Sequence, residues 1–279
     1  MSRLGDKVAV ITGASAGIGA ATARRFSKEG ARLVLTARRE GLLDTLARET
    51  GGQVVLGDIT QPAVRRAVVD AAGERVDILV NNAGYGQPGP VESVVPDDAR
   101  RQMEVNFFAA AELIRAVLPG MRRARAGRIV NVSSTAGLVG YPMFGWYCAS
   151  KHALEGLSDA LRLELAPFGI GVALIEPGPV RTEFFEVARG SMKSILADTE
   201  SPYRALFQNV DSIERDFIKH AASPEDVADI IFKAATASRP RDRYPVTFLA
   251  TMTRLALRFL PRRWLDAGMR RQFRIPHTM

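Results

Sequence analysis

Short apolar runs alternate with longer helical patterns over the first two thirds of the chain. The run Val8–Ile11 is apolar at every position, as expected for a strand that is covered on both faces of a parallel sheet. Runs of this kind predict strands at Lys7–Thr12, Arg32–Thr36, Gln53–Leu56, Asp77–Asn81, Arg128–Val132 and Gly171–Ile175. The stretches between them predict helices at Gly17–Glu29, Glu40–Thr50, Pro62–Ala72, Asp97–Arg123 and Trp146–Ala166. This alternation indicates an α/β fold with a doubly wound parallel sheet.

The pattern becomes irregular after Pro177. Residues 181–222 mix aromatic, small and charged side chains without a clear period, which is typical of a mobile segment over a site. We therefore interpret this segment as a substrate lid. A capped helix is predicted at Ser223–Ala237, and Tyr244–Phe248 is the last predicted strand.

Length and composition indicate a single domain. The chain has 279 residues, of which 47% are hydrophobic, and no linker divides it, so we expect one domain over residues 1–247 and a C-terminal extension over residues 248–279. The only cysteine, Cys148, excludes an intramolecular disulfide framework. Met1–Lys7 is too short and polar for a signal peptide, and no run reaches the roughly 18 apolar residues of a membrane-spanning helix. We therefore expect a cytoplasmic protein.

The formal net charge of +8 is concentrated near the C-terminus. Residues 238–279 carry ten arginines and two aspartates, which accounts for the whole excess. On a helical wheel, one face of the extension holds Phe248, Leu249, Met252, Leu255, Ala256 and Phe259. Arg254 and Arg258 lie on the opposite face. Such a helix can lie peripherally on an anionic membrane, cover the cleft of its own or a neighbouring subunit, or pack with its basic face in solvent. We expect no nucleic-acid partner, because no recognition motif accompanies the arginines.

A glycine-rich turn connects the first predicted strand to the first helix. It reads Thr12-Gly13-Ala14-Ser15-Ala16-Gly17-Ile18-Gly19. Glycines let backbone amides approach a pyrophosphate, whose charge a helix N-terminus stabilises. The turn residues that we expect to contact a dinucleotide are Gly13, Ser15, Gly17, Ile18 and Gly19.

The residues at the end of the second strand indicate which dinucleotide is bound. An acidic residue there would accept hydrogen bonds from a ribose 2′-hydroxyl, but this chain has Ala37 followed by Arg38 and Arg39. Guanidinium groups favour a 2′-phosphate by charge and by geometry. The sequence therefore favours NADP(H) over NAD(H). The alternative is that both arginines are simply solvated at a helix start.

Five further motifs follow in a fixed order. They are Asn81-Asn82-Ala83-Gly84, Asn106, Asn131-Val132-Ser133-Ser134, Tyr147-Cys148-Ala149-Ser150-Lys151 and Pro177-Gly178. Together with the glycine-rich turn they resemble the short-chain dehydrogenases/reductases over about residues 5–182. The resemblance implies a single Rossmann-like domain, hydride transfer between a nicotinamide cofactor and a carbonyl or alcohol, and a homodimer or homotetramer formed through two long central helices.

Tyr147 and Lys151 are the centre of the expected chemistry. They are four residues apart, so they share one helix face. A tyrosine must lose about three pKa units, or about 4 kcal/mol, to act as a good general base near neutral pH. One positive charge roughly 4 Å away supplies about that much at an effective dielectric constant near 20. We therefore expect Lys151, helped by an oxidised nicotinamide ring, to lower the pKa of Tyr147.

The resemblance assigns roles to further residues. Ser134 hydrogen-bonds the substrate oxygen, and Asn106 anchors a water that relays protons to Lys151. Asp58 contacts the adenine amino group, and Val180 and Thr182 lie near the carboxamide. The full set of cofactor contacts outside the turn is Arg38, Arg39, Asp58, Ile59, Asn82, Ala83, Gly84, Tyr147, Lys151, Pro177, Gly178, Val180 and Thr182. No metal is expected, because His220 and His277 have no metal-ligand partners at useful spacing, and His152, which follows Lys151, is interpreted as structural.

Many apolar side chains occur near the expected site. They are Leu138, Val139, Tyr141, Met143, Phe144, Phe184, Phe185, Met192, Ile195, Tyr203 and Phe207. If they line a cleft, the substrate is large and hydrophobic; the alternative is that most of them pack a helical lid. The C-terminal extension is similar to those of the steroid- and retinol-dehydrogenase-like branch. The sequence thus predicts an NADP(H)-dependent oxidoreductase for a hydrophobic ketone or aldehyde and its alcohol. An NAD(H)-linked dehydrogenase and a noncatalytic cofactor-binding or membrane-surface protein are the alternatives.

Overall fold

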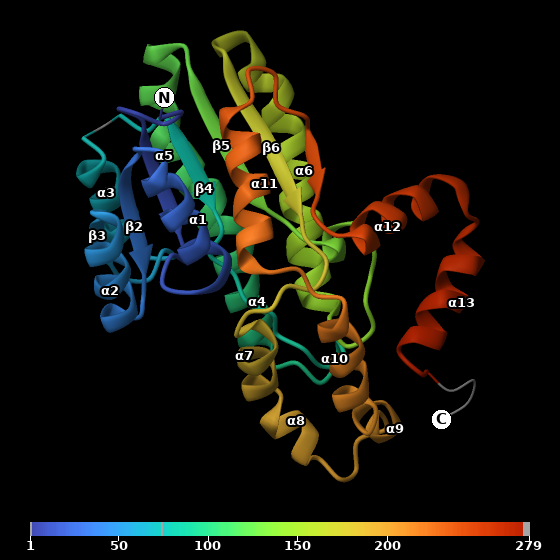
Figure 1. The fold of residues 1–279 in the computed structure, drawn as a ribbon. Helices are drawn as coiled ribbons and strands as arrows, with labels where there is room; N and C mark the ends of the chain where they lie inside the picture. Colours follow the sequence, from blue (N-terminus) through green and yellow to red (C-terminus); the bar gives the residue numbers. More distant parts are fainter. Residues whose placement is uncertain (1, 74, 276–279) are drawn as a thin grey trace.

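Seven parallel strands form one sheet in the order β3-β2-β1-β4-β5-β6-β7 (Figure 1). The structure is a computed structural model and describes residues 2–73 and 75–275. The strands are β1 (Val8–Thr12), β2 (Arg32–Ala37), β3 (Gln53–Leu56), β4 (Ile78–Asn81), β5 (Gly127–Val132), β6 (Ile170–Glu176) and β7 (Arg243–Pro245). The first six agree with the predicted strands to within one or two residues, and the order reverses direction beside β1, as in a doubly wound sheet.

Helices cover both faces of this sheet. One face packs against α1 (Gly17–Lys28), α2 (Glu40–Thr50) and α11 (Pro224–Thr236). The other packs against α3 (Pro62–Ala71), α5 (Ala109–Ala124) and α6 (Gly145–Leu165). Alternate residues of a strand serve the two sides: Ile11 belongs to the first core cluster and Val10 to the second. This double burial explains why the strands are apolar at consecutive positions.

The predicted helix at Asp97–Arg123 is not regular throughout. The structure has α4 (Pro96–Met103), a π-helical turn η1 (Glu104–Phe108) and then α5. A π-turn inserts an extra residue into the helical ladder and is frequent at functional sites. It shifts the helix face that Asn106 occupies, which periodicity alone does not reveal.

The segment expected to form a lid contains four short helices. They are α7 (Phe184–Ser191), α8 (Lys193–Ala197), α9 (Arg204–Phe207) and α10 (Val210–Lys219). They lie beyond the carboxyl ends of the strands (Figure 1), on the side where ligands bind in open α/β sheets. A parallel bridge between Val180 and Ala222 joins the two ends of the segment to each other.

The last predicted strand was placed too far along the chain. β7 ends at Pro245 instead of Phe248, and the Thr247 hydroxyl accepts a hydrogen bond from the Ala250 amide and so caps the next helix. That helix, α12 (Phe248–Phe259), is followed by α13 (Arg262–Gln272), and the pair projects from one side of the body (Figure 1). Among the described residues, no helix combines the length and apolar character needed to span a bilayer.

The extension does not pack as its helical wheel suggested. The apolar face of α12 is exposed, whereas Arg254 turns inward and binds the fully buried Glu176 at 2.7 and 2.9 Å. Of the three alternatives for this helix, the one in which it packs with its basic face in solvent is therefore contradicted at Arg254, whereas Arg258 is exposed. A buried carboxylate needs a partner, and Glu176 determines which side of α12 faces the body.

Candidate active site

The glycine-rich turn forms a tight cradle at the end of β1. A Cβ on Gly17 would lie 2.9 Å from Thr182 Cγ2, and a Cβ on Gly19 would lie 2.3 Å from the Gly13 carbonyl oxygen. Both contacts are too short for a side chain, so glycine is required at each position. The N-cap of α1, Ala16, has no side-chain acceptor, which leaves the first-turn amides open to an anion. The turn therefore fits a pyrophosphate.

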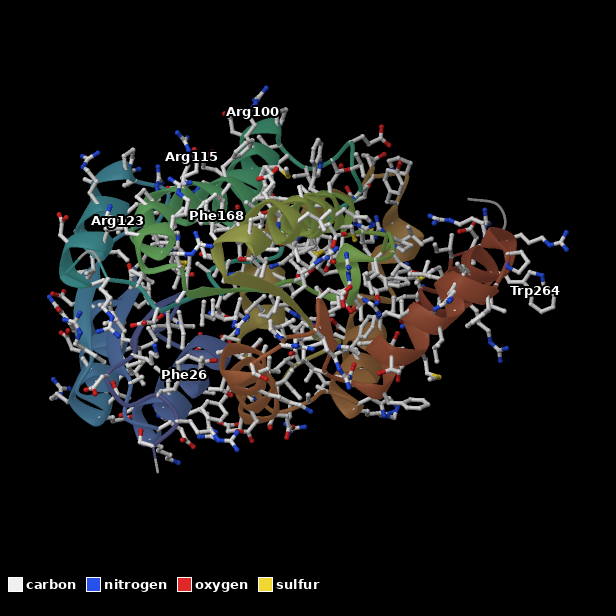
Figure 2. All side chains as sticks on the ribbon, turned by 90° about the horizontal axis from the view of Figure 1, so that it is seen from above. Phe26, Arg100, Arg115, Arg123, Phe168 and Trp264 are labelled. Atoms are coloured by element: carbon white, nitrogen blue, oxygen red, sulfur yellow. The ribbon has the colours of Figure 1, made fainter. Side chains whose placement is uncertain are left out.

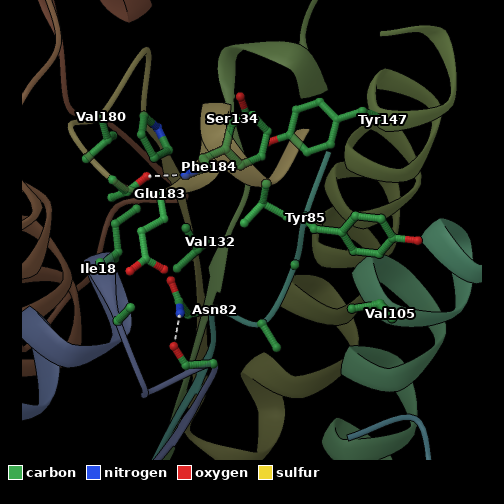
Figure 3. Close-up of a pocket in the computed structure, with 18 of the residues that line it drawn as sticks. Ile18, Asn82, Tyr85, Val105, Val132, Ser134, Tyr147, Val180, Glu183 and Phe184 are labelled. Atoms are coloured by element: carbon green, nitrogen blue, oxygen red, sulfur yellow. Dashed lines mark hydrogen bonds between the residues drawn. The ribbon is translucent and has the colours of Figure 1, made fainter. Parts of the chain in front are cut away.

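Asn82 and Thr12 connect this turn to the end of β4. Asn82 Nδ2 donates to the carbonyl oxygens of Thr12 and Gly13, at 3.0 and 3.2 Å (Figure 3). Thr12 Oγ1 accepts in return from the backbone amides of Asn82 and Ala83, each at 3.0 Å. These bonds hold the predicted cofactor contacts of two neighbouring strands in one rigid unit.

The two arginines after β2 differ in their surroundings. Arg39 Nη1 binds Glu183 Oε2 at 2.6 Å, and its Nε lies 3.3 Å from Ser15 Oγ. Arg38 is exposed and forms no ion pair with any residue that the structure describes. Both line the cavity beside Ala37. The guanidinium of Arg38 could therefore bind a phosphate directly. Arg39 would first have to give up its ion pair with Glu183.

Asp58 lines the cavity and is held by two groups. Its Oδ1 accepts from the Thr60 amide at 3.0 Å and from the Thr60 hydroxyl at 2.8 Å, and Arg101 binds its other oxygen. Partial burial alone would raise the pKa of Asp58, but these hydrogen bonds and the Arg101 charge together lower it. Asp58 is therefore a fixed, ionised acceptor on the cavity wall.

Tyr147 stands in the first turns of α6, and its hydroxyl faces Ser134 at the end of β5 (Figure 3). Its ring lies 6.3 Å from that of Phe144 and 5.4 Å from that of Phe184, measured between centroids. Burial in this apolar setting raises the pKa of Tyr147, and the hydrogen bond with Ser134 offsets only part of the rise. The groups of the protein thus act against the decrease that we expected from Lys151, and Tyr147 is protonated at neutral pH.

Lys151 is one turn further along α6 and is almost fully buried. Its Nζ donates to the Val132 carbonyl oxygen at 2.8 Å and lies 5.8 Å from the centre of the Tyr147 ring. Burial lowers the pKa of Lys151 to about 8, and the carboxylate of Glu155 limits that decrease. Glu155 is itself buried beside Arg243 Nε at 3.2 Å. The ammonium is therefore still charged at neutral pH.

Asn106 lies beneath the cavity and joins three parts of the site. Its Oδ1 accepts from the Tyr85 amide at 3.0 Å, and its Nδ2 donates to the Tyr85 carbonyl oxygen at 2.9 Å and to Ser150 Oγ at 3.1 Å. Ser150 Oγ donates in turn to the Tyr147 carbonyl oxygen at 2.7 Å. The sequence did not single out Ser150, although it lies between the two central residues of the motif and its small hydroxyl is suited to a buried link.

One cavity of about 420 Å³ brings nearly all the predicted site residues together. Its lining includes every predicted catalytic and cofactor residue except Gly19 and Asn106. Gly19 packs against the back of the turn, and Asn106 lies below the cavity floor. The residues that sequence motifs placed in one site are thus gathered there by the carboxyl ends of β1 to β6 and by the start of α6.

Aromatic side chains form the wall beyond Tyr147. The predicted Tyr141, Phe144, Phe184 and Phe185 line the cavity, together with Phe217 and Phe273, which the sequence did not single out. Phe273 lies 5.8 Å from Tyr141 and 6.0 Å from Phe217 between ring centroids. The other predicted substrate contacts do not line this cavity; they are Leu138, Val139, Met143, Met192, Ile195, Tyr203 and Phe207. Met143 and Met192 line a smaller neighbouring cavity, and Tyr203 donates to Glu92 at the surface. Among the described residues there is no cluster of metal ligands, and His277 lies outside them.

Comparison with known proteins decides the family. The sequence profile described as short chain dehydrogenase matches residues 7–192. The chain belongs to the short-chain dehydrogenase family. The NADPH-dependent 3-dehydrocapnine reductase of Ornithobacterium rhinotracheale is 34% identical to it over 271 residues, which covers 93% of this chain and 95% of that protein. The 17-beta-hydroxysteroid dehydrogenase type 1 of Homo sapiens is 35% identical over 256 residues, covering 86% and 77%.

Solved structures of the family agree with the fold. A short chain dehydrogenase/reductase from Burkholderia phymatum in complex with NAD superposes with a TM-score of 0.78 at 31% identity and covers 96% of both chains. The Rossmann-like single domain and the kinship with steroid dehydrogenases are thereby confirmed. The chain is an oxidoreductase of a family that binds nicotinamide cofactors and small substrates. Both phosphorylated and unphosphorylated cofactors occur among its relatives.

Proposed function

We propose that the protein is an NADP(H)-dependent reductase of bulky hydrophobic ketones or aldehydes, and that it can oxidise the matching alcohols. The observation that carries this proposal is the position of Tyr147. Its hydroxyl faces Ser134 where the dinucleotide cradle meets the aromatic wall (Figure 3). A carbonyl group placed there would contact a proton donor and a hydrogen-bond donor at once.

The protonation state of Tyr147 favours reduction. NADPH held by the glycine-rich turn and Arg38 would supply the hydride, and Tyr147, protonated because burial raises its pKa, would donate a proton to the carbonyl oxygen. Ser134 donates a hydrogen bond to the same oxygen and steadies the charge that develops there. Lys151 remains charged at neutral pH and stabilises the phenolate form of Tyr147 after the proton has been donated. We assign Asn106 a positioning role, because it connects the backbone of Tyr85 to Ser150 behind Tyr147.

The preference for NADP(H) rests on Arg38 and Arg39. Arg38 is unpaired among the described residues, and both lie beside the cavity next to a small Ala37, where no carboxylate competes for a ribose hydroxyl. The NADPH-dependent relative supports this assignment. The NAD(H)-linked alternative is favoured by the ion pair between Arg39 and Glu183, which a 2′-phosphate must break or extend.

The apolar wall defines the substrate class. We propose that residues 181–222 form the lid of a substrate pocket and that Phe184, Phe185 and Phe217 contact the substrate body. The relatives that act on a steroid and on 3-dehydrocapnine support a large substrate. We further propose a cytoplasmic homodimer or homotetramer whose C-terminal extension contacts a membrane, where lipophilic substrates partition.

Cofactor consumption tests this function directly. The oxidation of NADPH and of NADH is followed with aromatic ketones, steroids, retinal and long-chain aldehydes as substrates. Turnover with NADPH that rises with the apolar bulk of the substrate supports the proposal. Turnover only with NADH supports the NAD(H)-linked alternative, and failure to bind either cofactor contradicts the function. If cofactor binds and no carbonyl compound is reduced, the noncatalytic cofactor-binding protein becomes the better account.

A further inference from the structure

The helix α12 shows its larger apolar face to solvent. Ala250 is fully buried, and Thr253, Arg254 and Leu257 are partly buried on the same side. On the opposite side, the exposed large apolar residues of α12 and of the turn after it are Phe248, Leu249, Met252, Leu255, Phe259 and Leu260. Phe248 is 78% and Phe259 is 70% exposed. A helix that packed only for burial would take the reverse orientation, because exposed apolar area is unfavourable in water.

Ion pairs fix this orientation. Arg254 reaches from α12 to Glu176 at the end of β6, and Glu176 also lies 3.3 Å from Arg243 Nε. Arg243 continues the network to Glu155 and Asp159 on α6. If α12 were rotated so that its apolar face packed inward, the fully buried Glu176 would lose its ion pair with Arg254, which is energetically unfavourable. The apolar face is therefore a permanent feature of the surface and not a loosely packed end.

Basic and aromatic side chains border the apolar face. Trp264 on α13 is 63% exposed and lies on the outer side of the extension (Figure 2). The exposed arginines of the two helices are Arg258, Arg262, Arg263, Arg270 and Arg271. Asp266, paired with Arg262, is the one acidic residue of α12 and α13. The extension thus combines an apolar strip, an interfacial tryptophan and a strong positive charge.

Building on the membrane contact in the proposed function, we propose that the outer face of α12 and the start of α13 docks on an anionic phospholipid bilayer. Phe248, Phe259 and Trp264 enter the interface, and the arginines contact the lipid phosphates. Charge complementarity supports this partner over a second copy of the chain. A two-fold contact through the same face would bring two sets of arginines together, and a membrane supplies the opposite charge instead.

The docking surface is connected to the candidate active site. The inner side of α13 carries the partly buried Leu265 and Met269 and leads to Phe273, which is buried and lines the cavity. The eleven residues of α13 extend over only about 16 Å. A bilayer on the outer face therefore lies close to the apolar wall of the pocket, where a lipophilic substrate would enter.

Vesicle sedimentation tests the proposal on the full-length protein, independently of catalysis. Phosphatidylcholine vesicles are compared with vesicles that also contain phosphatidylglycerol. The protein is expected to sediment with the anionic vesicles only, and high salt is expected to release most of it. The double variant Phe248→Ser/Phe259→Ser is expected to lose at least roughly tenfold in partition coefficient. Arg258→Gln/Arg263→Gln is expected to lose binding to anionic vesicles as well.

A matched control comes from apolar residues exposed elsewhere. Leu42→Ser/Phe168→Ser removes two exposed large side chains that lie outside the extension, and it is expected to bind vesicles like the unchanged protein. Equal binding by Phe248→Ser/Phe259→Ser, or no binding of the unchanged protein to anionic vesicles, overturns the proposal. Sedimentation velocity without lipid is run in parallel. If Phe248→Ser/Phe259→Ser dissociates an oligomer there, the face is a subunit contact instead.

Discussion

Single side chains set the electrostatics of the candidate site. Lys151 is buried, and the carboxylate of Glu155, one turn along α6, opposes the decrease of its pKa. A charged Lys151 is needed to stabilise the phenolate of Tyr147, so its deprotonation should end catalysis. Because burial lowers the pKa of Lys151 to about 8, we predict that kcat/KM for carbonyl reduction falls above about pH 8.

Glu155 provides a sharper version of this test. Glu155→Gln removes a negative charge that favours the protonated form of Lys151. The decrease of kcat/KM at alkaline pH should therefore begin at a lower pH, by about one unit. Glu164→Gln, an exposed change on the same helix, serves as the control and should leave that pH unchanged. An unchanged pH in Glu155→Gln would mean that Glu155 has only a structural role.

The proposed preference for NADP(H) also depends on single residues. Arg38→Ala should weaken NADPH binding by about ten- to a hundredfold and leave NADH binding nearly unchanged, because only NADPH carries the 2′-phosphate. Glu183→Gln should tighten NADPH binding by releasing Arg39. Fluorescence titration with both cofactors measures these effects, with Arg48→Ala on α2 as the control. Equal losses for NADPH and NADH in Arg38→Ala would contradict the assignment.

The residues that carry motifs were predictable, and their partners were not. Tyr147, Lys151 and Ser134 could be named because their spacing along the chain is characteristic of the family. Ser150 and Glu183 escaped notice because their roles depend on which side chains meet across the fold. The groups of the protein alone raise the pKa of Tyr147, since the sequence shows the lysine charge but not the apolar rings of Phe144 and Phe184 around the phenol. The decrease that we expect from Lys151 together with an oxidised nicotinamide ring stays a prediction.

At the scale of helices and strands, the apolar pattern placed most of the sheet correctly. It succeeded because strands covered on both faces are apolar at every position, a signal that helices seldom give at that length. It missed the π-helical turn η1, because one extra residue in a helix hardly changes the composition of that segment. It left the orientation of α12 open, because the partner of Arg254 is a buried glutamate on a distant strand.

The ion pair between Arg254 and Glu176 should contribute to folding stability. Arg254→Ala leaves Glu176 with only the longer contact to Arg243, so we predict a loss of about 2 kcal/mol in the free energy of unfolding. Urea titration measures the change. The double variant Arg254→Ala/Glu176→Gln should recover part of the loss, because the buried charge is gone. A stability equal to that of the unchanged protein would show that α12 is held by other contacts.

The end of α13 should affect substrate binding more than turnover. Phe273→Ala removes one ring of the aromatic wall, so KM for a bulky ketone should rise about tenfold while KM for a small ketone stays nearly constant. Phe168→Ala, an exposed aromatic far from the cavity, is the control. A parallel rise of KM for both ketones would mean that Phe273 supports the fold instead of the pocket.

The whole molecule combines three surfaces in one domain. The carboxyl ends of the central strands and the glycine-rich turn line one part of the cavity, the helices of residues 181–222 add apolar side chains to it, and the C-terminal extension carries a basic apolar face. The first is built from motifs along the chain, so the sequence predicted most of the residues that line it, whereas their binding of a dinucleotide stays a prediction. The other two depend on how irregular segments fold over the site, so the sequence indicated their composition but not their geometry.

The central claim is that Tyr147 donates a proton during NADPH-dependent carbonyl reduction. The most direct measurement compares NADPH oxidation by the unchanged protein and by Tyr147→Phe, with NADPH binding measured on both. The account predicts that the variant binds NADPH normally and loses about 10³-fold in kcat/KM, because its ring still fills the site but has no proton to give. Turnover by Tyr147→Phe at the rate of the unchanged protein would contradict the account.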